Sequence, residues 1–398
     1  MPTMSPADTG VPQCVGVLGA GQLGRMFALE ALRLGVQVRF LTPRDTGATE
    51  GVGLTTVGDW RSPAVLRAFM SGCTVLTVEN EWAPLAEAEA EAAVMAAEGL
   101  PVPIFRPRAQ TLALVRDKLI QKQTLAAADL KVGPFRGCAT LAEAEAAADA
   151  LGWPVVVKRR RGAYDGYGNH NAANRDELRQ AWEALAEAPE GAFSGGVLLE
   201  AMVPFVRELA VGVARGADGS AVTYPVAYTE QADHRCAAVV VPAPIRPEVA
   251  KAAAALGQAV AAAFDVVGVC AVELFELADG ALLVNELAPR PHNSGHYSIE
   301  ACHSSQYDNH LRAVLGWPLG DPSLRAAHAV MINLLGSRSG PTLVDGMAEA
   351  MAIPGVAVHL YGKRECRPGR KMGHLTMLGD DADDLRRRAE AAAELIRL

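Results

Sequence analysis

Two glutamates, Glu273 and Glu286, stand at the ends of a segment that is typical of a β-hairpin. Between them, Asp279-Gly280 indicates a two-residue turn, and counting outward from that turn pairs the glutamates across antiparallel strands. Their Cβ atoms would be about 5 Å apart on one sheet face, where like charges repel unless a cation lies between them. Carboxylate oxygens suit Mg²⁺. Two solvated glutamates are the alternative, but the surrounding apolar residues predict burial, which favours the metal.

Two lysines and a glycine-rich loop could bind polyphosphate beside such a metal. Lys158 follows the apolar run at 154–157 and precedes the loop RGAYDGYG at 161–168, while Lys118 stands in the sequence Arg-Asp-Lys. A lysine ammonium group beside a glycine loop suits phosphate oxygens. The loop does not match G-x-x-x-x-G-K-[ST], so it is not the loop of the P-loop nucleotidases.

A second candidate for phosphate binding lies near the start of the chain. The stretch VLGAGQLGRM at 17–26 contains G-x-G-x-x-G after a short apolar run. Such glycines bring phosphate to a helix N-terminus. Binding of NAD also requires an acid at the end of the next strand, but the strand predicted at 36–41 ends in Thr42-Pro43. We therefore expect this loop to bind a phosphate other than that of NAD.

The elements that position these residues fall into three groups. Strands and helices alternate over the first hundred residues, which predicts a parallel sheet with helices on both faces. The predicted ranges are strands at 15–18, 36–41, 74–78 and 102–104 with helices at 22–34, 62–70 and 85–97. Next come helices at 111–127, 141–151 and 174–188 with strands at 153–159 and 197–200, then antiparallel strands at 206–215, 220–228 and 236–241 and a helix at 247–263. The predicted domains are 11–110, 111–200 and 201–398.

Composition narrows the possible partners. The chain has 398 residues and a net charge of −8, which argues against a protein that binds nucleic acid regardless of sequence. Its seven cysteines are scattered without a C-x-x-C motif, as expected for thiols in a reducing cytoplasm. No run of 18 apolar residues occurs, so no membrane span is predicted. A phosphate ligand would need a local positive pocket, for which the candidates are Arg159–Arg161, Arg290, Lys363, Arg370 and Lys371.

Six motifs together resemble the ATP-grasp superfamily, whose members hold ATP between two α+β domains. They are GQLGRM at 21–26, DKLIQK at 117–122, VVKRR at 156–160, YDGYG at 164–168, NELAPRPHNSGH at 285–296 and RPGRKMGH at 367–374. Within that superfamily the chain is similar to the N5-carboxyaminoimidazole ribonucleotide synthetases over nearly its whole length. The resemblance implies a fold of mixed α/β and α+β class, with an N-terminal Rossmann-like parallel-sheet domain, a small lid domain and a C-terminal antiparallel-sheet domain.

The family's reaction joins 5-aminoimidazole ribonucleotide, bicarbonate and ATP, and gives the N5-carboxylated nucleotide, ADP and phosphate in purine biosynthesis. By this resemblance ATP and Mg²⁺ are the cofactors, biotin is not needed, and the chain is a homodimer in the cytoplasm with neither nucleic acid nor membrane as a partner. Bicarbonate is a poor electrophile, so we expect ATP to convert it to carboxyphosphate before the exocyclic amine captures the carbon.

Carried over position by position, the resemblance assigns roles to individual residues. ATP would contact Lys118, Lys158, the loop Ala163, Tyr164, Asp165, Gly166, Tyr167, Gly168 and Asn169, the adenine hinge Glu200, Ala201, Met202 and Val203, the ribose ligand Glu208, and Asn285 with Glu286. Glu273 and Glu286 would bind Mg²⁺. The ribonucleotide would contact Gln22, Leu23, Glu79, Tyr164, Arg290, Lys363 and Arg370. The catalytic group would comprise Asp165 at the exocyclic amine, Arg290, His292 and Asn293 at bicarbonate, and Lys363.

Three positions depart from the family pattern. Gln231 stands where the family commonly has a histidine near ATP, and Ala288 stands where many ATP-grasp enzymes have asparagine. The segment Thr77-Val-Glu-Asn-Glu81 resembles the family's T-x-E-x-E but has Asn80 in place of an apolar residue, so Glu79 is assigned on that motif alone.

Other interpretations remain open. A different ATP-grasp ligase, such as a formate-dependent glycinamide ribonucleotide transformylase, usually has HDTG where this chain has HNSG at 292–295. A nucleotide-binding relative without activity would not need the carboxylate pair. His292 and His296 have the spacing of a zinc pair, but Pro291 and Gly295 disfavour a helix there. The remaining histidines singled out, His303, His310, His328 and His359, are interpreted as packed or surface side chains.

Overall fold

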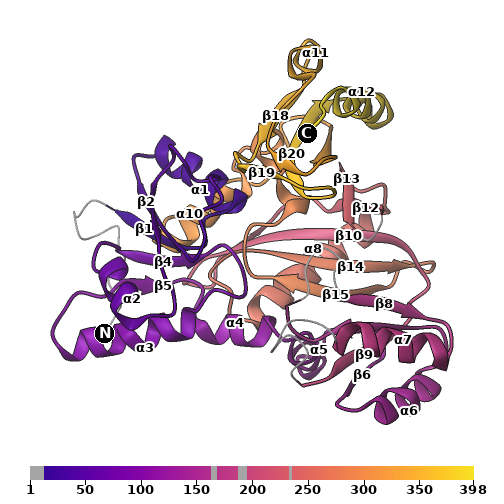
Figure 1. Ribbon diagram of the computed structural model, residues 1–398. Coiled ribbons are helices and arrows are strands. Elements are labelled where there is room, and N and C mark those ends of the chain that lie inside the picture. Colours follow the sequence, from indigo (N-terminus) through magenta and orange to yellow (C-terminus); the bar gives the residue numbers. More distant parts are fainter. Residues whose placement is uncertain (1–12, 163–167, 187–194, 233–234) are drawn as a thin grey trace.

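The computed structural model describes residues 13–162, 168–186, 195–232 and 235–398. Its described strands form three sheets of four or more strands, which follow one another along the chain, and one short two-stranded pair (Figure 1). Within these ranges, every helix is too short or too polar to span a bilayer. The mixed α/β and α+β class predicted from the sequence is confirmed.

The first sheet is parallel, with the strand order β3-β2-β1-β4-β5. Its strands are β1 (Cys14–Leu18), β2 (Gln37–Thr42), β3 (Leu54–Val57), β4 (Val75–Val78) and β5 (Ile104–Phe105), and its helices are α1 (Gln22–Arg33), α2 (Pro63–Met70) and α3 (Leu85–Ala97). The predicted alternation of strands and helices is confirmed. The prediction missed β3 at the sheet edge, because none of its four residues is buried and it therefore has no apolar face.

The second sheet is small and antiparallel, with the order β6-β9-β7-β8. Its strands are β6 (Phe135–Cys138), β7 (Val155–Arg159), β8 (Asn169–Ala172) and β9 (Val197–Ala201), and α6 (Leu141–Leu151) and α7 (Arg175–Ala186) cover it. The prediction of a single helix at 111–127 is wrong. It is two helices, α4 (Ala109–Val115) and α5 (Lys118–Ala127), because Asp117 caps α5 by accepting the N–H groups of Leu119 and Ile120.

The third sheet runs through the rest of the molecule in the order β15-β14-β10-β12-β13-β16-β20-β18, with β11 beside β10. Its strands are β10 (Phe205–Arg215), β11 (Ala221–Thr223), β12 (Ala227–Ala232), β13 (Arg235–Val241), β14 (Gly268–Leu277), β15 (Leu282–Ala288), β16 (His328–Leu335), β18 (Ala357–Leu360) and β20 (Lys371–Gly379). The predicted strand at 220–228 is two strands, because Tyr224-Pro225 interrupts it. The remaining elements are α8 (Pro247–Ala263), the 3₁₀ turn η2 (Asn293–Gly295), α9 (Ser298–Ala301), α10 (Gln306–Leu315), β17 (Gly340–Pro341), α11 (Met347–Met351), β19 (Glu365–Cys366) and α12 (Ala382–Leu395).

The hairpin of β14 and β15 has a different turn from the one predicted. The Leu277 N–H donates to the Ala281 carbonyl oxygen, and the Leu277 carbonyl oxygen accepts the Gly280 N–H, so three residues close the hairpin. Gly280 adopts φ +87°, which glycine tolerates best. This shifts the pairing by one residue, to Phe275 opposite Leu283. A bulge at Asn285 then shifts it back, so that Glu273 lies opposite Glu286. The predicted glutamate pair is correct, although the turn used to derive it is not.

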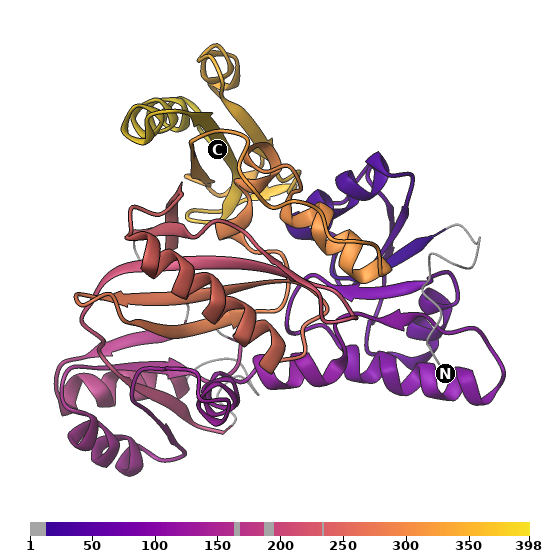
Figure 2. The same ribbon diagram turned by 180° about the vertical axis from the view of Figure 1, so that it is seen from behind.

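Helix α10 joins the third part of the chain to the first. It packs against α1, and its Tyr307, Leu311 and Val314 belong to the core beneath the parallel sheet (Figure 2). His310 connects the two sheets directly, because its Nδ1 accepts the N–H of Val269 on β14 and its Nε2 bonds the Thr77 hydroxyl on β4. Residues 306–315 pack with the N-terminal sheet although they lie far along the chain. The domain limits near 110 and 200 remain a prediction.

Candidate active site

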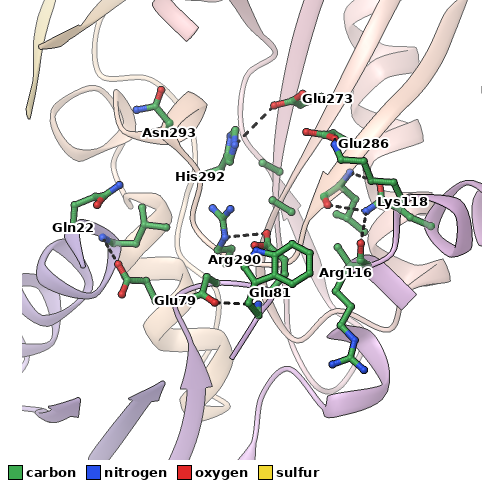
Figure 3. A pocket seen from close by; sticks show the side chains of 18 of the residues that line it. Gln22, Glu79, Glu81, Arg116, Lys118, Glu273, Glu286, Arg290, His292 and Asn293 are labelled. Atoms are coloured by element: carbon green, nitrogen blue, oxygen red, sulfur yellow. Dashed lines mark hydrogen bonds and ion pairs between the residues drawn. The ribbon is translucent and has the colours of Figure 1, made fainter. Parts of the chain in front are cut away.

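A cavity of about 360 Å³ lies between the parallel sheet, α5, and the β14–β15 hairpin (Figure 3). Residues predicted for the site come to it from separate segments of the sequence. Those that line it are Gln22, Leu23, Glu79, Lys118, Glu273, Glu286, Arg290, His292 and Asn293. The cavity therefore brings together both predicted metal ligands with residues assigned separately to phosphate, bicarbonate and nucleotide.

The two glutamates form its most strongly perturbed pair. Burial raises the pKa of Glu273, and the neighbouring carboxylates of Glu286 and Glu208 raise it further. Lys118 lowers the pKa of Glu286, with which it forms an ion pair between Nζ and Oε2. The bulged residue Asn285 turns toward the same face, where its Nδ2 lies 3.4 Å from Oε2 of Glu273. The Oδ1 atom of Asn285 accepts from Lys158 instead, so the two carboxylate groups supply the oxygen atoms on this side of the hairpin, which is the kind of donor that fits Mg²⁺.

The end of α4 and the start of α5 hold Lys118 in position. Asp117 is buried and accepts hydrogen bonds from Nε and Nη2 of Arg160 at 3.1 and 2.8 Å. The Lys118 N–H donates to the Arg160 carbonyl oxygen at 2.9 Å. These bonds tie α5 to the end of β7, so Asp117 and Arg160 orient Lys118, the lysine predicted to bind phosphate.

Lys158 lies in a buried cluster with a second lysine. Its Nζ is 2.5 Å from Oε2 of Glu200 and 3.2 Å from Oδ1 of Asn285. The other oxygen of Glu200 is 2.7 Å from Nζ of Lys122, which also donates to the Val284 carbonyl oxygen. Burial alone would raise the pKa of Glu200, but the two lysines hold it below its usual range. The Glu200 side chain is therefore engaged with lysines, and sequence reasoning missed Lys122.

The predicted adenine hinge is the connection from β9 to β10. The Ala201 N–H donates to Pro134 and the Met202 N–H to Pro154, so these two amides are already used. The Val203 carbonyl oxygen accepts from Phe205. Glu208 follows on β10, where its position opposite Phe275 brings its charge near Glu273. The predicted hinge and the predicted ribose ligand thus lie near the same end of the third sheet as the carboxylate pair.

The glycine loop at 19–24 is occupied differently from the prediction. The carboxylate of Glu79 accepts the N–H of Gly21 at 2.5 Å and that of Leu23 at 3.2 Å. A Cβ on Gly21 would be 2.4 Å from Oε1 of Glu79, so only glycine permits this approach. The expectation that these N–H groups bind a substrate phosphate is therefore corrected: an internal carboxylate already binds them. Gln22 and Leu23 still line the cavity.

Arg290 and His292 lie beside the carboxylate pair. Nε of Arg290 is 3.0 Å from Oε1 of Glu81, a residue that the sequence analysis quoted in its motif but did not assign. His292 places Nε2 3.8 Å from Oε1 of Glu273, and its Nδ1 is 2.9 Å from the Ser294 hydroxyl. Nδ1 of His296 instead bonds the side chains of Gln306 and Tyr307.

Asn293 lines the cavity but directs its amide elsewhere. Its Nδ2 and Oδ1 each bond the amide of Asn333 on β16 at 2.8 Å, and both side chains are buried. This reciprocal pair of hydrogen bonds fixes η2 against the third sheet. The amide of Asn293 thus has a structural partner on β16, and the assignment of Asn293 to bicarbonate stays a prediction.

The C-terminal motif contributes a different residue from those assigned. Lys371 lines the cavity, whereas Lys363 and Arg370 do not. Nζ of Lys363 donates to the Lys371 carbonyl oxygen at 2.7 Å, and Nη1 of Arg370 donates to that of Glu365 at 2.6 Å. Lys363 and Arg370 thus hold the backbone around Lys371, which the sequence analysis had named for the positive pocket but had not assigned to the substrate.

Part of the predicted ATP loop lies outside the described residues: Ala163, Tyr164, Asp165, Gly166 and Tyr167. Of its remaining residues, Gly168 accepts the Arg159 N–H at 2.8 Å, and Asn169 pairs with Lys158 across β7 and β8. Gln231, at the position of the family's histidine, lies in β12.

Comparison with known proteins covers nearly all of the chain. Three family models match in succession: a ribonucleotide synthetase preATP-grasp domain over 13–115, an ATP-grasp domain over 123–307, and a phosphoribosylaminoimidazole carboxylase C-terminal domain over 329–388. The N5-carboxyaminoimidazole ribonucleotide synthase of Mycobacterium tuberculosis is 41% identical over 98% of this chain and 89% of that protein. The protein of that name from Synechococcus elongatus is 38% identical over 96% and 94%.

Solved structures agree with these relatives. N5-carboxyaminoimidazole ribonucleotide synthetase from Thermotoga maritima superposes with a TM-score of 0.82 at 34% identity, covering 97% of this chain and 99% of that one. N5-carboxyaminoimidazole synthase from Aspergillus clavatus, in complex with ADP and 5-aminoimidazole ribonucleotide, gives a TM-score of 0.84 at 30% identity over 96% and 98%. The chain therefore belongs to the N5-carboxyaminoimidazole ribonucleotide synthases of the ATP-grasp superfamily.

Proposed function

We propose that this chain is a ligase that uses ATP and bicarbonate to carboxylate the exocyclic amine of 5-aminoimidazole ribonucleotide, giving N5-carboxyaminoimidazole ribonucleotide, ADP and phosphate in purine biosynthesis. The observation that carries the proposal is a single cavity that joins the glutamate pair and Lys118 to Arg290 and His292. Full-length similarity to synthases of this name supports the choice of substrate.

The phosphates of ATP bind near Lys118 and Lys158, with Mg²⁺ on Glu273 and Glu286. The opposed carboxylates support this metal, because their mutual repulsion is relieved by a divalent cation. When bound, Mg²⁺ neutralises charge on phosphate oxygens. Lys118 then exchanges its ion pair with Glu286 for a phosphate oxygen, and Lys158, held by Glu200, keeps its ammonium group directed at the same place.

The adenine and ribose lie along the connection from β9 to β10. The Glu200–Val203 segment borders the base, with its backbone rather than the Glu200 carboxylate as the contact, since two lysines hold that carboxylate. Glu208 accepts the ribose hydroxyls.

Bicarbonate binds beside Arg290 and His292, where Nε of the guanidinium group faces Glu81 and Nη1 donates to the Pro291 carbonyl oxygen. The ribonucleotide occupies one part of the cavity, with Gln22, Leu23 and Glu79 on one side of it and Lys371 on the other. Lys371 meets its phosphate, and Lys363 and Arg370 orient the segment that carries Lys371. This arrangement puts the reacting amine between the nucleotide and the activated carboxyl group.

The reaction proceeds in two transfers. An oxygen of bicarbonate attacks the γ-phosphorus, the bond to the bridging oxygen breaks, and ADP leaves. The amine nitrogen then attacks the carbon of carboxyphosphate, the bond from that carbon to the phosphate oxygen breaks, and the amine proton passes to Asp165. Enclosure by the protein limits competing hydrolysis of the intermediate.

We further propose a cytoplasmic homodimer. Exposed Leu29 and Leu32 on α1 give an apolar surface that a second copy could bury, and the free cysteines fit a reducing compartment. Sedimentation equilibrium tests the dimer: a monomer mass at micromolar concentration would contradict it.

The function is tested by phosphate release with each substrate omitted in turn. Release should require ATP, bicarbonate and 5-aminoimidazole ribonucleotide together, and formate with glycinamide ribonucleotide should not replace them. With ¹⁸O-bicarbonate, one label should appear in the released phosphate. Unlabelled phosphate would mean that ATP activates the nucleotide instead, and phosphate release with formate would favour the transformylase.

A further inference from the structure

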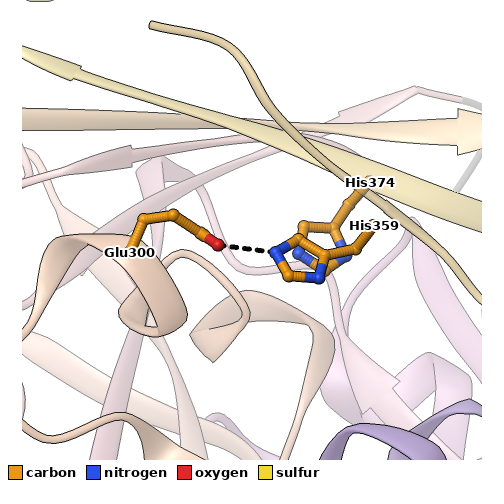
Figure 4. A group of neighbouring side chains, drawn as sticks. All are labelled: Glu300, His359 and His374. Atoms are coloured by element: carbon orange, nitrogen blue, oxygen red, sulfur yellow. Dashed lines mark hydrogen bonds and ion pairs between the residues drawn. The ribbon is translucent and has the colours of Figure 1, made fainter. Parts of the chain in front are cut away.

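Three side chains with metal-binding groups meet outside the active-site cavity (Figure 4). Glu300 lies on α9, His359 on β18 and His374 on β20. The two histidines are direct partners across antiparallel strands, so their side chains share one face of the sheet. One carboxylate oxygen and one nitrogen of each ring all lie within 4.8 Å of one another.

The hydrogen bonds of this group leave two buried atoms without a partner. Oε1 of Glu300 is 2.6 Å from Nε2 of His359, and Nδ1 of His374 is 3.0 Å from the Tyr361 hydroxyl. Within the described part of the chain, Oε2 of Glu300 and Nε2 of His374 have no hydrogen-bond partner, and His374 is fully buried. Unsatisfied buried polar atoms are uncommon in native proteins and call for an explanation.

A cation accounts for both atoms. If Nδ1 of His374 donates its hydrogen to Tyr361, the lone pair lies on Nε2, which is the usual arrangement behind a metal-bound histidine. Burial holds the pKa of His374 well below its ordinary value, so the ring is neutral, as ligation requires. Glu300 supplies an anionic oxygen beside two imidazole rings stacked at 4.6 Å.

We propose that Glu300, His359 and His374 form a binding site for a divalent transition-metal ion of the zinc class. Two imidazoles and one carboxylate are a donor set that Zn²⁺ uses, with a fourth position for water. Mg²⁺ prefers oxygen ligands and belongs at Glu273 and Glu286 instead. Binding draws the three donors to about 2.1 Å from the ion and releases the hydrogen that His359 shares with Glu300.

The site connects two functional segments. Glu300 follows the η2 turn by a few residues, so it belongs to the stretch that carries His292, whereas His374 lies on the strand that begins at Lys371. An ion here would tie the bicarbonate segment to the C-terminal strands. It would stabilise the folded chain without taking part in the reaction.

Cobalt is the probe for this site. Metal-stripped protein is titrated with Co²⁺ in excess Mg²⁺, which keeps the oxygen site at Glu273 and Glu286 filled. We expect one Co²⁺ per chain with the intense visible absorption of a four-coordinate site. His359→Gln preserves a hydrogen-bond donor to Glu300 but removes a ligand, so it should weaken Co²⁺ binding at least about tenfold. His303→Gln, at an exposed histidine outside the group, should bind Co²⁺ as the unaltered protein does.

Zinc provides a second measurement. Zn²⁺ should raise the Tm of the stripped protein and of His303→Gln, but not that of His359→Gln or Glu300→Gln. Circular dichroism of the stripped variants should match that of the unaltered protein, and Glu300→Gln replaces His359→Gln as the test if the latter does not fold. Absence of visible absorption, or equal Co²⁺ affinity in the ligand variants, would overturn the proposal. So would a thiolate charge-transfer band, which would assign the ion to cysteine.

Discussion

Glu79 accepts the backbone N–H of Gly21 at an N···O distance of 2.5 Å, so the glycine loop already holds an anion at the start of α1. Leu23 donates to the other oxygen of the same carboxylate. A helix N-terminus attracts negative charge, and here a side chain from the neighbouring strand β4 supplies it. The loop therefore resembles a dinucleotide-binding fingerprint while its N–H groups serve to orient Glu79 in the cavity.

Replacing Glu79 tests this role. Glu79→Gln replaces one of the two acceptor oxygens that bond the Gly21 and Leu23 N–H groups with an amide NH₂, which should lower the free energy of unfolding by about 1 kcal/mol. It should raise the KM for the ribonucleotide much more than the KM for ATP, because Glu79 lines the nucleotide side of the cavity. Steady-state kinetics and urea denaturation check both effects. Glu248→Gln, in the exposed first turn of α8, is the matched control. Equal changes in both KM values would contradict the placement of the nucleotide.

The carboxylate pair is tested through Glu286. Glu286→Gln should lower the rate of Mg²⁺-dependent ATP turnover on the order of 100-fold or more, because a neutral amide no longer balances the metal charge. Circular dichroism should remain unchanged, since the hairpin pairing does not depend on that charge. Glu394→Gln, at an exposed position on α12, serves as the control. Activity retained at saturating Mg²⁺ would show that the pair does not bind the metal.

The C-terminal motif makes a distinct prediction about substrate affinity. Lys371→Ala should raise the KM for the ribonucleotide at least about tenfold with little effect on that for ATP. Lys363→Ala and Arg370→Ala should act in the same direction, because their side chains hold the backbone around Lys371. Lys251→Ala on the exposed side of α8 should change neither constant. If the KM for ATP rises equally in these variants, the nucleotide pocket lies elsewhere.

His310 makes part of the stability depend on pH. Burial lowers its pKa to about 3, whereas in the unfolded chain it titrates near its ordinary value. Below about pH 6.5 this histidine therefore binds a proton in the unfolded state but stays neutral in the folded state, so the free energy of unfolding falls as pH falls. Between pH 7.5 and 5 the loss attributable to this group is about 2 kcal/mol.

The matched experiment is urea denaturation at both pH values. His310→Asn keeps an acceptor for the Val269 N–H, should be less stable than the unaltered protein at pH 7.5, and should lose less stability on acidification. His303→Asn, at the surface, should keep the full pH dependence. An undiminished loss in His310→Asn would mean that other groups account for the acid sensitivity.

Much of the fold could be predicted from periodicity, and the errors have local causes. Apolar residues at helical spacing predicted the bounds of α1, α2, α3 and α8 to within one or two residues. The break at Arg116-Asp117 escaped notice because the apolar spacing continues through it, although aspartate favours a helix start. The hairpin turn was assigned from Asp279-Gly280 alone, and the bulge at Asn285 has no simple sequence signal.

The site was harder to predict where it depends on partners distant in sequence. Motif resemblance identified Lys118, Arg290 and His292 as residues of one site, and the cavity brings them together. It could not reveal that Glu79 would fill the glycine loop or that Asn333 would engage Asn293. Lys122 stands four residues after Lys118 in the same motif, but its burial beside Glu200 follows from packing between α5 and β9. Such pairings are set by the tertiary structure.

The third sheet extends without interruption from β15, which bears Glu286, to β20, which begins at Lys371. A continuous ladder of backbone hydrogen bonds resists bending across its strands, so the metal hairpin and the C-terminal strands should move as one body. The small sheet of β6 to β9 is joined to this body through the short stretch between Ala201 and Phe205 and through α5. Opening to admit ATP and closing around it should therefore be a hinge rotation of the small sheet about those connections, with the part of the cavity beside Lys371 keeping its shape throughout.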